Sequence, residues 1–439
     1  MVNLTRSGIK YGLACDEERI RRWEAGEVSW PREPYRLALT ELTHTDLEDL
    51  GFAPTKRAPR SSTSSGEYLI KADSPNITPQ VVDLVGQGEG ENDVRRREFV
   101  GLTGAALFSA VLGPTEKAPA TGQDLERIAA ALVDYSTPLD GPADLNALAA
   151  TVSAAKQNYQ ACRYAQVSAE LPALLRKLRA ACAVLDGDAS LRAHALSAEA
   201  HHVAASILIK QEDKGLAWLA ADRSVQAAYA SQSPLMIGSS SRIITHALMD
   251  GGHHRAATDA ARTAALRMDS GLFEPSADDL SIYGSLLLRG AIAAARTGNR
   301  HAIAELLDEA AATGERLGHD GNHMWTAFGP NNVLCHRVNV ALSLGDAGTA
   351  IDYARQVDIG KLPINERKAT LLLDTSRAFL MCGKHDKALH VLRAAGDVAP
   401  EEVAGRPAAL RLVRDILATA PISIRREARE YAVSLGVIA

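Results

Sequence analysis

The stretch "MDGGHHRAATDAARTAALRM", from Met249 to Met268, decides the fold class of this chain. It places a polar, glycine-containing turn between two segments rich in alanine and leucine. A glycine after a helix can adopt the left-handed backbone conformation that ends the helix. Ala257 follows Gly252 by five residues, and a side chain this small lets two antiparallel helices approach closely. The stretch therefore predicts a tight helical hairpin.

The same pattern recurs along the second part of the chain. "SLGDAGTAIDYARQV" pairs Gly345 with Ala350, and "MCGKHDKALHVLRAAGDVAP" pairs Gly383 with Ala388. Further turns lie near residues 213 and 298, so that successive turns are roughly 38 to 47 residues apart, a spacing typical of stacked helix pairs. We expect an all-α fold in which an α-solenoid presents one helix of each pair on a concave binding face.

Composition supports helices and excludes several functional classes. The chain of 439 residues is 46% hydrophobic but only 5% aromatic, and its net charge of -5 gives no overall basic surface, so any DNA contact must be local. Its 5 cysteines are odd in number and form no CxxC pair, which argues against a disulfide framework or a zinc knuckle. With no signal peptide and no long apolar span, we expect a cytoplasmic protein without membrane contact.

The chain divides into three regions by composition. Residues 1–52 carry helix signals, and residues 53–94 are rich in Pro, Ser, Gly and charge and predict a flexible linker. Residues 95–439 are helical in pattern nearly to the end. Their first segment, "RRREFVGLTGAALFSAVLG", has the twin arginines of an export signal, but such signals are N-terminal, so we expect a helix packed on the repeats.

The first region contains "DEERIRRWEAGEVSWPREPYRLALTELT", which begins at Asp16. Asp16 suits a helix N-cap and Gly26 a C-terminal turn, while Ile20 and Trp23 share one face of the helix between them. A capped helical hairpin with a solvated arginine face, which binds no DNA, is one interpretation of this pattern.

The segment also resembles the recognition helix and following helix of Xre/Cro-type helix-turn-helix regulators, whose recognition helix enters the major groove. The resemblance implies double-stranded DNA as a partner and a homodimer as the binding species. The implied DNA contacts are Glu17, Glu18, Arg19, Arg22 and, at the end of the preceding helix, Lys10. That family has a further helix in front, and here few residues precede Leu13, so the first helix is missing or displaced.

The repeats resemble tetratricopeptide repeats. From Trp325 to Val403 they are similar to the domain that actinobacterial Xre-type regulators, frequently linked to secondary metabolism, carry behind their helix-turn-helix. This similarity implies a sensor that binds a peptide, a small molecule or a protein and mediates dimerisation.

Candidate ligand-binding residues lie in "MWTAFGPNNVLCHR", which combines aromatic area with polar groups. They are Trp325, Asn331, Asn332, His336 and Arg337, joined by Arg242 and Arg289 from earlier repeats. The alternative is that the tryptophan is core and the asparagines cap the helix after the Gly-Pro pair.

Catalysis and metal binding have no support in the sequence. Its histidine pairs lack partners at the spacing of a tetrahedral metal site, and no phosphate loop or nucleophile elbow is present. We therefore expect no metal, no cofactor and no enzyme. The sequence predicts a DNA-binding transcriptional regulator with an effector-binding repeat domain; the alternative is a repeat scaffold that acts only through protein contacts.

Overall fold

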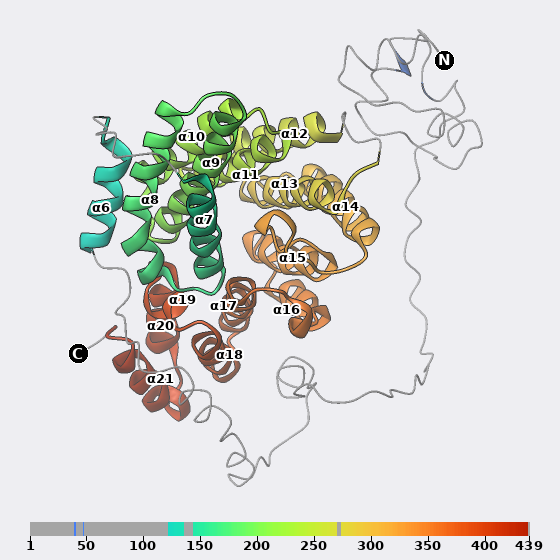
Figure 1. Cartoon of the computed structure of the whole chain (residues 1–439). Helices are drawn as coiled ribbons and strands as arrows, with labels where there is room; N and C mark the ends of the chain where they lie inside the picture. The colour runs from blue at the N-terminus through green and yellow to red at the C-terminus, as the bar shows by residue number, and fades with distance from the viewer. Residues whose placement is uncertain (1–38, 41–46, 48–121, 136–143, 270–273, 438–439) are drawn as a thin grey trace, which may run out of the picture. The chain divides into compact units, whose positions relative to one another are not determined.

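A computed structural model describes residues 39–40, 47, 122–135, 144–269 and 274–437 of the chain. The expected helix-turn-helix unit, including its DNA-contact residues Lys10, Glu17, Glu18, Arg19 and Arg22, and the expected linker lie outside the described residues apart from Leu39, Thr40 and Leu47. The described residues form sixteen α-helices and two short 3-10 helices, with no β-strand among them. The all-α class is thus confirmed for this part of the chain (Figure 1).

The helices from α7 to α18 follow one another as consecutive pairs. The first helices of the pairs are α7 (Leu145–Gln160), α9 (Gly187–Lys210), α11 (Pro234–Asp250), α13 (Ala277–Arg296), α15 (Pro330–Ser343) and α17 (Asn365–Met381). The second helices are α8 (Tyr164–Val184), α10 (Lys214–Ala230), α12 (His254–Asp269), α14 (Arg300–Leu317), α16 (Ala347–Gln356) and α18 (His385–Val398).

The turns confirm the local prediction from glycine and alanine. Gly252, Gly345 and Gly383 have φ angles of 89°, 79° and 71°, in the left-handed region that glycine tolerates best. The alanines that follow by five residues are fully buried where the second helix of each pair begins. Three earlier turns use the same backbone conformation with Cys162, Glu212 and Gln232. The turn near residue 213 was expected, whereas the other two contain no glycine and were not.

The first helices form a closed ring. Each of α7, α9, α11, α13, α15 and α17 contacts the next one in this order, and α17 in turn contacts α7 (Figure 1). Ala369 of α17 and Ala399 are part of the same apolar core as residues of α7, α8 and α9. The sequence predicts a solenoid with a concave face, and the structure adds that this solenoid closes on itself.

Four further helices flank the ring: α6 (Gly122–Val133), α19 (Pro400–Ala404), α20 (Pro407–Thr419) and α21 (Ile422–Ser434). The 3-10 helix η2 (His323–Trp325) precedes α15, and η3 (Ile359–Lys361) precedes α17. No helix in the described ranges is both long and apolar enough to cross a bilayer.

Candidate functional site

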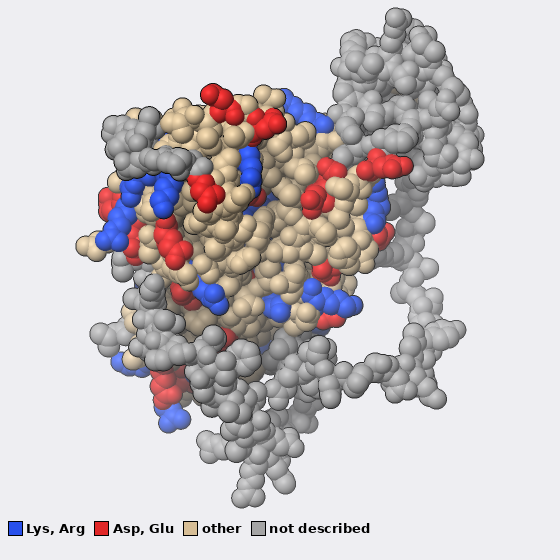
Figure 2. Space-filling model, in the orientation of Figure 1, with Lys and Arg blue, Asp and Glu red and all other residues tan. Residues whose placement is uncertain are grey.

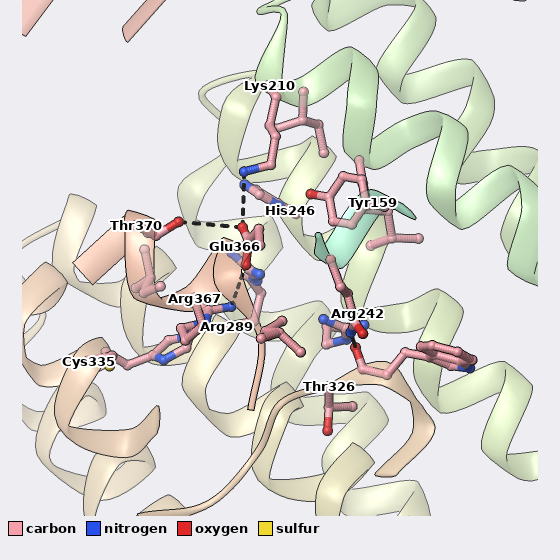
Figure 3. A pocket seen from close by; sticks show the side chains of 18 of the residues that line it. Tyr159, Lys210, Arg242, His246, Arg289, Thr326, Cys335, Glu366, Arg367 and Thr370 are labelled. Atoms are coloured by element: carbon pink, nitrogen blue, oxygen red, sulfur yellow. Dashed lines mark hydrogen bonds and ion pairs between the residues drawn. The ribbon is translucent and has the colours of Figure 1, made fainter. Parts of the chain in front are cut away.

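A cavity of about 230 Å³ lies inside the ring of first helices. Every one of the six helices contributes side chains to its wall, and Trp325, Thr326, Ile364 and Arg406 complete it. Figure 3 shows several of these side chains directed into the same space from different helices. Because one helix of each pair faces the cavity, residues far apart in sequence meet there.

The lining residues occupy equivalent positions in successive repeats. His202 and Arg242 each precede the positive-φ residue of their turn by ten positions, and Arg289 and His336 precede theirs by nine. In these four helices, the residue nine or ten positions before the turn therefore faces the cavity. This is expected when successive repeats stack with a constant rotation.

One part of the cavity wall is a fully compensated charge network. Lys210 Nζ lies 3.0 Å from Glu366 Oε1 and 2.9 Å from Glu402 Oε1, and Arg406 lies 2.7 Å from the same Glu402 oxygen. Tyr164 donates its hydroxyl proton to the other oxygen of Glu402. Burial alone would lower the pKa of Lys210, but the two carboxylates outweigh it and hold that pKa above its ordinary value.

This network links the early helix α9 to the late helices α17 and α19. Lys210 ends α9, whereas Glu366 lies in the first turn of α17 and Glu402 lies in α19, where its side chain is fully buried. Gln211 adds a hydrogen bond of 3.0 Å to the carbonyl oxygen of Gly405. The closure of the ring thus depends on polar contacts between residues almost two hundred positions apart.

A second group of charges in the cavity has no such compensation. Arg242 from α11, Arg289 from α13 and Arg367 from α17 line the cavity, and the Nε atom of each is buried with no hydrogen-bond partner among the described residues. Burial, followed by the charges of neighbouring arginines, lowers the pKa of Arg242 to about 10 and that of Arg289 to about 9. Arg242 and Arg289 therefore stay charged at neutral pH while they repel each other.

Histidines beside these arginines are neutral. Burial lowers the pKa of His202, His246 and His336 well below 6.5, and the positive charges of the cavity lower it further. Nε2 of His202 lies 3.3 Å from a guanidinium nitrogen of Arg242, where a neutral ring can accept a hydrogen bond. These rings add polar groups to the wall without adding charge.

The segment before α15 contributes Trp325 and Thr326 to the cavity wall. Its backbone has positive φ at Met324, Trp325 and Ala327, which is uncommon for residues other than glycine. Gln160 of α7 holds it from across the ring, because its amide donates to Asn322 Oδ1 and to the Trp325 carbonyl oxygen, each at 3.1 Å. Strained backbone of this kind persists only where surrounding contacts impose it.

The structure distributes the seven predicted ligand-binding residues between two locations. Trp325, His336, Arg242 and Arg289 line the cavity. Asn331, Asn332 and Arg337 do not: Asn331 donates to Asp320 and accepts from the backbone of Asp358, and Arg337 pairs with Asp308 at 3.2 Å. Asn332 is buried, with its Oδ1 unpartnered within the described part of the chain.

The aromatic residues of this segment have different roles. Phe328, not Trp325, is the core residue: it is fully buried, and a Cβ atom on Gly284 of α13 would lie 2.0 Å from its ring. Trp325 stays partly exposed in the cavity, with Lys156 Nζ 5.4 Å from its ring centroid.

Sequence reasoning missed most of the cavity wall. Lys156, Tyr159, His246, Arg367 and the Lys210 network were not among the candidates, although counting back from each turn by a fixed number of residues would have found several of them. In the described ranges, no group of three or more His, Cys, Asp or Glu side chains could hold a metal ion, and the histidine pairs considered above belong to no such group.

No protein-family model matches the chain, and a search of curated proteins finds no similar sequence.

Proposed function

We propose that the chain is a DNA-binding transcriptional regulator in which the ring of helix pairs is the effector-binding domain. The observation that carries the effector-binding part is the cavity to which all six first helices contribute polar side chains. A concave, partly apolar space with a few converging polar groups is the usual form of a small-molecule site. Its volume of about 230 Å³ suits a small molecule rather than a folded protein partner.

The DNA-binding part of the proposal is supported by sequence. The segment from Asp16 to Thr43 resembles the recognition helix and following helix of Xre/Cro-type regulators. In such a regulator Arg22 would read a base edge, and two copies of the chain would bind two half-sites as a homodimer.

The ring offers a way to couple the two parts. A ligand in the cavity would touch α11, α13 and α17 at once, and α17 also carries Glu366 of the closing network. If the ring has two conformations that differ in how tightly it closes, a ligand that binds one of them better shifts the population toward that conformation. In the proposed mechanism this shift changes the spacing of the two DNA-binding segments in the dimer.

The experiment begins with selection of duplexes from a random DNA library by the full-length chain. The recovered duplex is then titrated at two salt concentrations. A regulator should enrich a defined sequence and bind it with an affinity that falls steeply with salt. Arg22→Ala should weaken binding by 5-fold to 100-fold, the range expected for loss of one base-reading side chain, about 1–3 kcal/mol.

Arg36→Ala, in the segment expected to form the following helix, is the matched control and should leave the affinity within about 2-fold. If no sequence is enriched, the regulator proposal is wrong. The rival function, a repeat scaffold that acts only through protein contacts, would then remain.

A further inference from the structure

The charges that line the cavity do not balance. Seven basic residues and two acidic ones, Glu366 and Asp374, line it. Glu199 and Glu402, behind the wall, pair with Lys156 and with the Lys210 network, and Arg296 at the rim is exposed. The interior is thus left with an excess of two positive charges.

The visible outer face has no such excess. On the face of the molecule drawn in Figure 2, basic and acidic side chains are interspersed. Inside, neither Arg242 nor Arg289 forms an ion pair with a described residue, and Arg367 has only a distant one, 3.7 Å from Glu366. Glu366 already pairs with Lys210 at 3.0 Å, so it cannot compensate Arg367 as well.

Buried charges without partners are costly, and folded proteins retain them where a ligand supplies the opposite charge. The planar guanidinium group matches the oxygens of phosphates and carboxylates in two parallel hydrogen bonds. Here three guanidinium groups arrive from three different helices, and Figure 3 shows Arg242, Arg289 and Arg367 around the same space. Three donors from different directions suit a tetrahedral anion with three terminal oxygens better than a planar carboxylate.

We propose that the cavity binds a small phosphate monoester, with its phosphoryl oxygens held by Arg242, Arg289 and Arg367. At pH 7 a phosphate monoester carries between about 1.5 and 2 negative charges, which matches the excess of the wall. Tyr159 and Trp325 border the same cavity and offer aromatic surface to the organic part of the ester. The pKa of the Tyr159 hydroxyl is raised to about 12, mainly by burial, so it remains a hydrogen-bond donor.

This inference rests on the proposed function only in taking the cavity as the effector site. The test uses the full-length chain, without DNA, titrated calorimetrically with phenyl phosphate and with phenyl sulfate at matched ionic strength. The two probes have nearly the same shape, but the sulfate ester carries a single charge. Phenyl phosphate should bind one molecule per chain, at least about 10-fold more tightly than phenyl sulfate.

Two substitutions locate the site. Arg289→Gln should weaken phenyl phosphate binding by about 10-fold to 100-fold, the effect of losing a charge-assisted contact. Arg316→Gln, on the exposed face of α14, is the matched control and should leave the affinity unchanged. If Arg289→Gln does not fold, Arg242→Gln takes its place, and circular dichroism decides which variant is used.

A second measurement separates a ligand-binding arginine from a structural one. In chloride buffer Arg289→Gln should raise the Tm, because it removes an uncompensated buried charge. It should also abolish the increase in Tm that phenyl phosphate causes in the unmodified chain. A structural arginine would lower the Tm when replaced.

Equal affinity for the two esters, or unchanged binding by the folded Arg289 variant, would each overturn the phosphate assignment. The two proposals fail separately. Phenyl phosphate binding without sequence-specific DNA binding removes the regulator proposal and keeps the phosphate site, whereas DNA binding without phenyl phosphate binding does the reverse.

Discussion

The wall of the cavity contains two groups of buried charges that differ in one respect. Lys210 and Arg406 are surrounded by Glu366 and Glu402 at hydrogen-bonding distance. The arginine cluster of Arg242, Arg289 and Arg367 lies in the same cavity, but its members face one another and neutral histidines. Glu366, 3.7 Å from Arg367, already pairs with Lys210. The first group is complete within the chain, and the second is not.

We assign the first group of charges to the stability of the fold and the second to ligand binding. A buried ion pair contributes little net stability when intact but is strongly destabilising when one partner is removed. A buried charge that never had a partner works the other way, because its removal relieves a desolvation penalty. Replacing a cation in each group should therefore change stability in opposite directions.

The largest expected effect comes from Lys210→Met, which leaves Glu366 and Glu402 buried without their shared cation. We expect the free energy of unfolding to fall by about 3–5 kcal/mol, as for other broken buried ion pairs. Urea denaturation measures it, with Glu430→Gln on the exposed surface of α21 as a control that should change it by less than about 0.5 kcal/mol. A loss no larger than that of the control would mean that the network does not close the ring.

The second effect is the pH dependence of stability. His336 and His201 are buried, and burial lowers the pKa of each, to about 4 for His201 and well below 6.5 for His336. Below pH 6.5 the unfolded chain binds protons at these residues while the native chain does not. Stability present above pH 6.5 is therefore lost as the pH falls, by about 1 kcal/mol per histidine at pH 5.5.

Urea denaturation at pH 7.5 and 5.5 measures this loss, and His336→Gln should reduce it. Bound phenyl phosphate sharpens the comparison: the pKa of His336 is lowered by Arg367 and Arg289, whereas that of His201 is lowered by Arg223 and Arg179. A ligand on the arginine cluster should thus shrink the share of the pH dependence that belongs to His336 and leave the share of His201 unchanged. Equal effects on both would contradict the placement of the ligand.

A smaller effect of opposite sign is expected for Arg242→Met. The methionine fills much of the same space and removes an uncompensated charge, so the free energy of unfolding in chloride buffer should rise by about 1 kcal/mol. The measurement is the same urea titration used for Lys210→Met. If both substitutions destabilise the chain, the arginine cluster belongs to the framework, and the contrast between the two groups disappears.

The smallest effect concerns the segment that carries Trp325. Gln160→Ala removes its contacts with Asn322 and with the Trp325 carbonyl oxygen, and should lower the free energy of unfolding by about 1 kcal/mol or less. Hydrogen exchange should increase in the amides from 320 to 328, while Gln356→Ala on the surface of α16 leaves them unchanged. Unchanged exchange in both variants would show that Gln160 does not hold this segment.

Much of the fold was predictable because its determinants are local. The glycine turns at Gly252, Gly345 and Gly383 and the alanines that follow them depend on backbone conformation and side-chain size within a few residues. Turns built on Cys162 and Gln232 escaped prediction, because no local rule favours these residues at positive φ and tertiary packing imposes it.

The candidate site was predictable only in part. Arg242, Arg289 and His336 line the cavity because an inner helix repeats at a regular interval, and Trp325 lines it from the segment before α15. Arg337 has the same kind of side chain but pairs with Asp308 instead. The residue type alone predicted Arg337 as well as Arg242 and Arg289 to be ligand contacts. Only the helix face on which each arginine lies distinguishes them.

The sequence by itself determined the all-α class, the helical hairpins and the recurrence of one inner helix per pair, since 3.6-residue periodicity and turn chemistry act over short distances. The tertiary structure alone decided that the solenoid closes into a ring and that Lys210 meets Glu402, 192 residues later. It also decided which arginines are left without a counter-charge. These outcomes follow from small rotations added over many repeats, and that sum is not encoded at any single position.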